Sequence, residues 1–174
     1  FKAKIMNYAT IKYNDIANGL GVRTSLFVSG CSHKCKGCFN SEAWDYNYGA
    51  PFTKQVEDDI IKSLEVSYVD GLSLLGGDRV NQEGLYPFLM RVKTEIKNKN
   101  VWCYTGYLFE DLLKGGKAHF LHTDEILSCI DVLVDGKFIL EQKNISLKFK
   151  GSENQRIIDV KKSIQEGEVV LFDV

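Results

Sequence analysis

Residues 24–38 read TSLFVSGCSHKCKGC, and the rest of the fold is interpreted outward from this stretch. Its first six residues are small or apolar and have the length and composition of a short buried strand. The strand runs directly into Gly30 and a loop that carries Cys31, Cys35 and Cys38. Because ligands of α/β proteins gather where strands end, this junction is the first candidate for a functional site.

Beyond this loop, apolar runs of strand length alternate with helical patterns, which indicates a sheet built from βα units. Thr53 is a suitable N-cap for the first helix, and Pro87 fits the first turn of the second. We expect strands at 71–77, 101–105 and 131–134, helices at 53–64, 82–97, 108–113 and 124–129, and strand-like segments at 146–150, 156–160 and 169–174. The sequence therefore predicts a single α/β domain over residues 1–174 with a strand-rich C-terminal tail.

The composition is that of an ordinary globular protein, with 44% hydrophobic and 26% charged residues. Lys and Arg number 22 and Asp and Glu number 23, so the net charge is −1, which excludes a broadly basic surface for nucleic acid. No apolar run approaches the roughly 20 residues of a membrane span, and no signal peptide is recognisable. The five cysteines are an odd number that fits a disulfide framework badly. We expect a soluble cytoplasmic protein in a reducing compartment.

The cysteine loop has the spacing C-x3-C-x2-C between a strand and the next helix. Three thiolates from one tight loop can bind three irons of a [4Fe–4S] cluster and leave the fourth iron open to another ligand. Gly30 and Gly37 allow the backbone to fold closely around such a group.

A structural zinc site is the alternative, with His33, Cys103 or Cys129 completing four ligands. Zinc sites usually take their ligands as two closely spaced pairs, and this sequence has no second pair. Three free thiols are a further alternative. Spacing alone favours the iron–sulfur interpretation and leaves the other two open.

The surrounding residues carry a family resemblance. The loop resembles the cluster motif of the radical S-adenosylmethionine (SAM) superfamily, and the segment 18–23 (NGLGVR) looks like the entry segment of glycyl-radical-enzyme activases. Residues 38–40 (CFN) and 44–45 (WD) are similar to the residues at and after the third cysteine of those activases. Further positions resemble the activating proteins of anaerobic (class III) ribonucleotide reductases: His33, Gly37, 104–107 (YTGY), 131–138 (DVLVDGKF) and 151–158 (GSENQRII).

This resemblance implies a radical SAM oxidoreductase that installs a glycyl radical on anaerobic ribonucleoside-triphosphate reductase. It implies a [4Fe–4S] cluster held by Cys31, Cys35 and Cys38, reductive cleavage of SAM to methionine and a 5′-deoxyadenosyl radical, and a flavodoxin-like electron donor. No nucleic acid or membrane partner is expected. Because a full eight-unit barrel needs about 200 to 250 residues, a chain of 174 residues fits a partial (β/α) barrel of the radical SAM type.

The same resemblance, together with the position of strand ends, suggests the residues that contact SAM. The family usually has Gly-Gly-Glu where this chain has Gly76, Gly77 and Asp78, so the acid here is shorter by one methylene. The expected SAM-binding set is Gly37, Cys38, Phe39, Gly76, Gly77, Asp78, Thr105, Gly106, Asp135 and Lys137.

Two other functions stay open at this point: an activase of another glycyl radical enzyme, such as a pyruvate formate-lyase, and a zinc-binding interaction module without catalysis. Cys103 and Cys129 are expected to be buried core residues. The run 154–156 (NQR) interrupts two strand-like stretches, and we expect it either to hold the tail over the barrel or to meet the partner protein.

Overall fold

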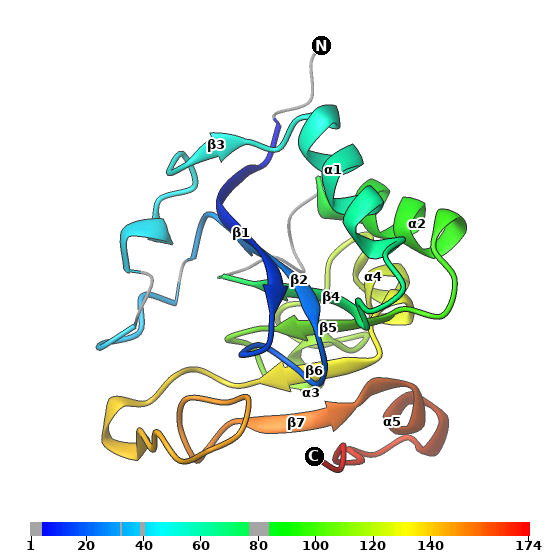
Figure 1. Ribbon diagram of the computed structural model, residues 1–174. Helices are drawn as coiled ribbons and strands as arrows, with labels where there is room; N and C mark the ends of the chain where they lie inside the picture. Colours follow the sequence, from blue (N-terminus) through cyan, green and yellow to red (C-terminus); the bar gives the residue numbers. More distant parts are fainter. Residues whose placement is uncertain (1–4, 32, 39–40, 77–83) are drawn as a thin grey trace.

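The computed structural model describes residues 5–31, 33–38, 41–76 and 84–174 (Figure 1). The strands of this described part join in one seven-stranded sheet of order β3-β1-β2-β4-β5-β6-β7. The strands are β1 (Asn7–Asp15), β2 (Arg23–Val28), β3 (Ala50–Pro51), β4 (Gly71–Leu75), β5 (Asn100–Tyr104), β6 (Val132–Asp135) and β7 (Arg156–Asp159).

The centre of the sheet is parallel, because β2, β4, β5 and β6 pair side by side in the same direction. These are the four strands expected from apolar runs, and nearly all of their residues are buried. The outer strands β1, β3 and β7 are antiparallel to their neighbours. The mixed α/β class is therefore confirmed. The sheet is open, so this topology does not establish the expected barrel of the radical SAM type.

The helices are α1 (Lys54–Leu64), α2 (Leu85–Glu95), α3 (Phe109–Leu112), α4 (Thr123–Cys129) and α5 (Val160–Glu166), with short 3₁₀ turns η1 (Ser41–Trp44) and η3 (Leu140–Gln142). The expected cap of α1 is confirmed, because the Thr53 side chain accepts a hydrogen bond from the Val56 amide at 3.3 Å. Pro87 lies in the first turn of α2, as expected.

The two faces of the sheet differ. On one face, each of the five helices in the described residues contributes buried side chains to a common core with Leu26, Leu74, Cys103 and Leu133 of the central strands. On the other face, a smaller cluster forms around Trp102, with Val132, Val134 and Ile157 and the partly buried Tyr104, Phe149 and Phe172. Figure 1 shows α1, α2 and α4 grouped on the right of the view. The light-blue cysteine loop and the orange loop that leads into β7 lie on the left.

Two expected strands of the tail are wrong. Residues 146–150 form turns and bends, because Phe149 has a φ of 59°, which an extended strand does not allow. The Asn144 side chain also accepts a hydrogen bond from the Ser146 amide and closes a local turn. Residues 169–174 make one isolated bridge, between Leu171 and Ile158, instead of a strand.

Of the helices that the described residues form, none has the length and apolar character needed to cross a membrane.

Candidate functional site

Cys31, Cys35 and Cys38 line one cavity of about 180 Å³ at the carboxyl ends of the parallel strands. Each of the three residues is half-buried. The Cys38 amide donates to the Cys35 carbonyl at 3.1 Å and forms a tight turn around the last two cysteines. The spacing of the loop thus brings the predicted ligands to one wall of one cavity.

The start of the loop is fixed by backbone hydrogen bonds to η1. The Gly30 amide donates to the Ala43 carbonyl at 2.7 Å, and the Cys31 amide donates to the Trp44 carbonyl at 3.0 Å. Gly30 has a φ of 100°, and a Cβ there would lie 2.1 Å from the Tyr46 ring. A side chain at this position would therefore clash with Tyr46, which follows η1, unless the loop or that ring moved.

Two further close contacts hold the loop from other elements. Gly37 has a φ of 80°, and a Cβ there would lie 2.8 Å from the Leu140 side chain, which belongs to η3. On the opposite side, the His33 imidazole occupies the space above Gly106 at the end of β5. The cysteine loop is thus packed between η3 on one side and the end of β5 on the other.

The ends of β4, β5 and β6 form the wall opposite the cysteines. Gly76, Thr105 and Gly136 line the cavity directly after these strands, and Gly106 follows Thr105. Gly76 has a φ of 94°, and a Cβ there would lie 2.2 Å from the Val28 carbonyl oxygen, so the end of β4 packs tightly on β2. Parallel strands end at the same edge, which explains why residues far apart in the sequence meet here.

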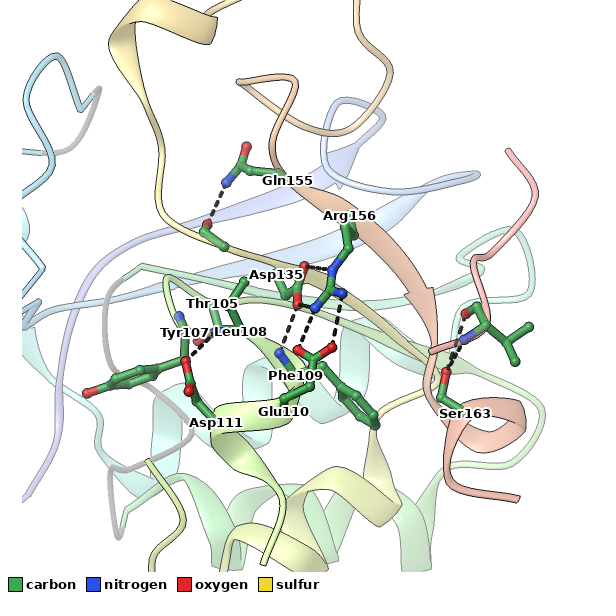
Figure 2. Close-up of polar contacts among 12 residues, drawn as sticks. Thr105, Tyr107, Leu108, Phe109, Glu110, Asp111, Asp135, Gln155, Arg156 and Ser163 are labelled. Atoms are coloured by element: carbon green, nitrogen blue, oxygen red, sulfur yellow. Dashed lines mark hydrogen bonds and ion pairs between the residues drawn. The ribbon is translucent and has the colours of Figure 1, made fainter. Parts of the chain in front are cut away.

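Asp135 lies outside the residues that line the cavity. It follows Val134 at the end of β6, and the alternation of side chains turns it to the helix-covered face. Its fully buried carboxylate accepts a hydrogen bond from the Phe109 amide at 2.8 Å and pairs with Arg156 at 2.5 Å (Figure 2). The expected contact with SAM thus falls on a carboxylate that already has two partners within the chain.

The Arg156 guanidinium also pairs with Glu110 of α3 at 2.7 Å, so one side chain joins β7, β6 and α3. The hydrogen bonds to Asp135 and Glu110 raise the Arg156 pKa further above its usual value. The same pairing lowers the pKa of the Glu110 carboxyl. This clamp fixes the strand end that presents Gly136 to the cavity.

The run 154–156 holds the tail over the sheet, which is one of the two roles expected for it. The Asn154 side-chain amide donates to the Lys137 carbonyl at 2.8 Å. The Gln155 side-chain amide donates to the Gly136 carbonyl at 3.0 Å (Figure 2). Lys137 itself is exposed and is absent from the cavity lining. Gln155 lines the cavity as well, so the contact is part of the site.

Several lining residues were not predicted from the sequence, among them Tyr104, Trp44 and Phe138. The Tyr104 hydroxyl and the Trp44 indole N–H are buried and have no hydrogen-bond partner among the described residues. Burial raises the pKa of the Tyr104 phenol, so it stays protonated at neutral pH. Orphaned buried donors are costly in an empty protein and are explained where a ligand supplies the acceptor.

Arg23, at the start of β2, is fully buried. Its guanidinium donates to Ser73 Oγ at 2.6 Å and to the Leu72 carbonyl at 2.8 Å, and lies 5.6 Å from the Trp102 ring centroid. Burial lowers its pKa to about 10, so it remains charged at neutral pH. This charge lies on the same face of the sheet as the Trp102 cluster.

A second cavity, of about 380 Å³, adjoins the first and shares its lining residues Cys38, Leu75, Tyr104, Phe138 and Gln155. The two together have the size of an ordinary small-molecule site, about 300–1,000 Å³. A pair of joined cavities with thiols in one and orphaned donors along the wall fits a metal cluster next to an organic cofactor.

Within the described ranges, no group of three or more Cys, His, Asp or Glu side chains is gathered closely enough to bind a metal ion. The three cysteines therefore line the same cavity, but their thiols are farther apart than the ligands of a single metal ion. Their arrangement, three soft ligands facing one cavity, fits an iron–sulfur cluster. Cys103 and Cys129 are 0% and 3% exposed in the helix-covered core, so neither can complete a zinc site with the loop.

The expected contacts Phe39, Gly77 and Asp78 lie outside the described residues. Gly37 is described, and it is exposed and packs against Leu140 instead of lining the cavity. Cys38, Gly76, Thr105 and Gly106 are the members of the expected set that the cavity brings together.

Residues 17–158 match the family described as a 4Fe-4S single cluster domain. A protein of Haemophilus influenzae named "Anaerobic ribonucleoside-triphosphate reductase-activating protein" is 44% identical over 157 residues, which cover 87% of this chain and 97% of the relative. Relatives of the same name from Escherichia coli (strain K12) and enterobacteria phage T4 are 41% and 38% identical, over 86% and 87% of this chain and 96% and 93% of their own lengths.

The chain belongs to this family of activating proteins. The resemblance found in the sequence, to the activating proteins of anaerobic ribonucleotide reductases, is thereby confirmed. The 4Fe-4S match begins before the cysteine loop and ends in β7, so it spans the elements that surround the cavity.

Proposed function

We propose that this protein activates an anaerobic ribonucleoside-triphosphate reductase by generating a glycyl radical on it. The observation that carries the proposal is the single cavity that Cys31, Cys35 and Cys38 share with the ends of β4, β5 and β6. The names of its relatives support the identity of the partner. The enzyme class is a radical SAM oxidoreductase, acting in the cytoplasm with a flavodoxin-like electron donor.

The three cysteines are the proposed ligands of a [4Fe–4S] cluster. When bound, a [4Fe–4S] cluster reduced by the electron donor would supply an open iron to bind SAM and one electron for its reductive cleavage to methionine and a 5′-deoxyadenosyl radical. The chain's own contribution is to hold the thiols on one wall and to keep the opposite wall close. Gly76, Gly106 and Gly136 belong to that wall, where their backbone lines the cavity.

The proposed SAM site is the wall formed by Gly76, Thr105 and Gly106, together with Cys38. Gly77, Asp78, Phe39 and Lys137 stay in the proposal on the strength of the resemblance alone. We assign Asp135 a positioning role, because its carboxylate fixes the strand end before Gly136 and is occupied by Arg156. Gly37 is assigned to the turn of the cysteine loop.

The open sheet supports a partial barrel of the radical SAM type as part of the same proposal. Its four parallel strands end at one edge, and the face away from the helices carries the second cavity. Because SAM is bound at that edge, the partner's glycine has to approach the same opening. The walls would exclude water and hold the reactants together, which matters for a radical that reacts with its nearest neighbour.

Two experiments test the proposal. Anaerobic reconstitution with iron and sulfide should give iron–sulfur absorbance and SAM cleavage to 5′-deoxyadenosine. Cys31→Ala, Cys35→Ala and Cys38→Ala should each lose both, whereas Cys129→Ala, a matched change in the core, should keep both. Full SAM cleavage in a loop variant would contradict the ligand assignment. One zinc per chain without iron or sulfide would favour the binding module.

Incubation of the loaded protein with either glycyl radical enzyme identifies the partner. We expect a glycyl radical signal in electron paramagnetic resonance (EPR) spectra with the anaerobic ribonucleoside-triphosphate reductase and none with a pyruvate formate-lyase. The reverse pattern would replace this proposal by the activase of the lyase.

A further inference from the structure

His33 of the cysteine loop reaches the end of β5. It lies two residues after Cys31 and two before Cys35, so its position fixes the middle of the loop. A Cβ built on Gly106 would lie 2.5 Å from His33 Cδ2 and 2.8 Å from Nε2. The imidazole therefore fills the space that a side chain at position 106 would take.

A second contact holds the same imidazole. The rings of His33 and Tyr107 meet edge to face, with centroids 4.5 Å apart and an interplanar angle of 71°. Such aromatic pairs contribute beyond simple burial. The ring thus rests on the backbone of Gly106 and against the side chain of the next residue, in the turn that follows β5.

We propose that His33 is a positioning residue that docks the cysteine loop onto the end of β5, and that position 106 is glycine because the imidazole occupies its side-chain space. Unlike Gly30 and Gly37, Gly106 does not have a left-handed φ. Alanine is therefore compatible with its backbone, and the requirement for glycine comes from the neighbouring ring.

The consequence for the site rests on the proposed function. Thr105 and Gly106 belong to the proposed SAM wall, and Cys31 and Cys35 belong to the cluster wall. The His33 ring joins these two walls directly. It thereby sets the distance between the thiol ligands and the cofactor, on which electron transfer to SAM depends.

The docking itself can be tested without any cofactor, because Lys34 and Lys36 in the loop are exposed trypsin sites. In the full-length protein without cluster, His33→Ala should be cut at these lysines about two- to tenfold faster than the wild type, the range expected for one aromatic contact. His33→Phe should stay protected, because it keeps a ring over Gly106. His119→Ala, in a remote surface turn, is the matched control and should digest like the wild type.

A double-mutant cycle tests the role of the glycine. Gly106→Ala should also speed cleavage at the two lysines, because the added methyl displaces the imidazole. The double variant His33→Ala/Gly106→Ala should be cut no faster than His33→Ala, since the methyl then has no ring to displace. The proposal would be overturned if the rate increases of the two single variants multiplied in the double variant, or if His33→Ala were cut at the wild-type rate.

The protein reconstituted with its cluster allows a measurement that a change in loop stability alone would not affect, namely its dependence on SAM concentration. His33→Ala should retain wild-type iron and sulfide but need about tenfold more SAM to produce the SAM-dependent change in the EPR spectrum of the reduced cluster, a loss of about 1.4 kcal/mol. His33→Phe should restore the wild-type response. Equal SAM dependence in wild type and His33→Ala would overturn the positioning role. A wild type that takes up no cluster would instead refute the proposed function and leave the proteolysis test standing.

Discussion

The two faces of the central sheet are built differently from the same strands. Toward the helices, β4 presents Leu72 and Leu74, both 0% exposed in the main core. Toward the other side, the same strand presents Ser73 and Leu75, the first bonded to Arg23 and the second lining both cavities. The helix-covered face is packed mainly by apolar side chains, and the other face keeps the buried Arg23 guanidinium and the Tyr104 hydroxyl, which is unpartnered within the described part of the chain. Stability thus comes mainly from the first face, and the second is shaped for a ligand.

The largest effect should come from a pair of matched truncations in β4. Leu74→Ala removes a fully buried side chain under the helices and should cost about 2–5 kcal/mol of unfolding free energy. Leu75→Ala, one residue on, faces the cavities and should cost less, because no packed core closes over it. Urea unfolding of both variants measures the difference. Equal losses would break the distinction between the two faces.

Arg156→Ala tests the clamp at the edge between the faces. It leaves the Asp135 carboxylate, 0% exposed, without its cation. Because Arg156 is itself partly exposed, we expect a loss of about 2–3 kcal/mol, below the full cost of breaking a buried pair. Lys161→Ala, which removes the exposed pair with Asp131, is the control and should cost less than about 1 kcal/mol. A loss no larger than that of the control would mean that the clamp does not fix β6.

Tyr104→Phe should have the opposite sign. The substitution deletes a buried hydroxyl that has no partner among the described residues, so the ligand-free protein should melt about 2–4 °C higher. Calorimetry on the protein without cofactor measures this. Tyr68→Phe, at a 61% exposed ring, should leave the melting temperature unchanged. A lower melting temperature for Tyr104→Phe would show that its hydroxyl already has a stabilising partner.

The smallest effect concerns Glu110 and pH. Arg156 lowers the folded-state pKa of Glu110 below its usual 4.5, so the stabilisation is full above that pH and is lost as pH falls through the folded pKa. The carboxylate is 53% exposed, and the contribution should stay below about 1 kcal/mol. Glu110→Gln should therefore lose less stability than the wild type between about pH 5 and pH 3 in urea titrations. If the unfolding free energies of Glu110→Gln and the wild type changed in parallel with pH, the effect of Arg156 on the Glu110 pKa would be contradicted.

The parts of the fold that the sequence predicted are those with a simple burial pattern. β2, β4, β5 and β6 are nearly continuous apolar runs, and parallel strands covered on both faces have that signature. β1 escaped prediction because most of its residues are half-buried or exposed. α5 escaped because its seven residues bury only Val160 and Ser163.

The part of the candidate site that rests on a local motif could be predicted from the sequence. The part that is assembled by the fold from distant segments could not. C-x3-C-x2-C identifies Cys31, Cys35 and Cys38 within one loop. Tyr104 and Gln155 become lining residues only because β5 and the segment before β7 end at the same edge. Asp135 was placed at the right edge, but the strand's alternation turns its carboxylate to the other face, which strand ends alone do not reveal.

The cysteine loop lies outside both hydrophobic clusters, since neither contains Cys31, Cys35 or Cys38. In small zinc domains the metal replaces a missing core, and removing it unfolds the chain. Here the sheet and helices are complete without the loop, and the loop is held by side chains packed on three glycines. The consequence concerns biogenesis: if the proposed function holds, loading of the cysteine loop need not be coupled to folding of the sheet and helices.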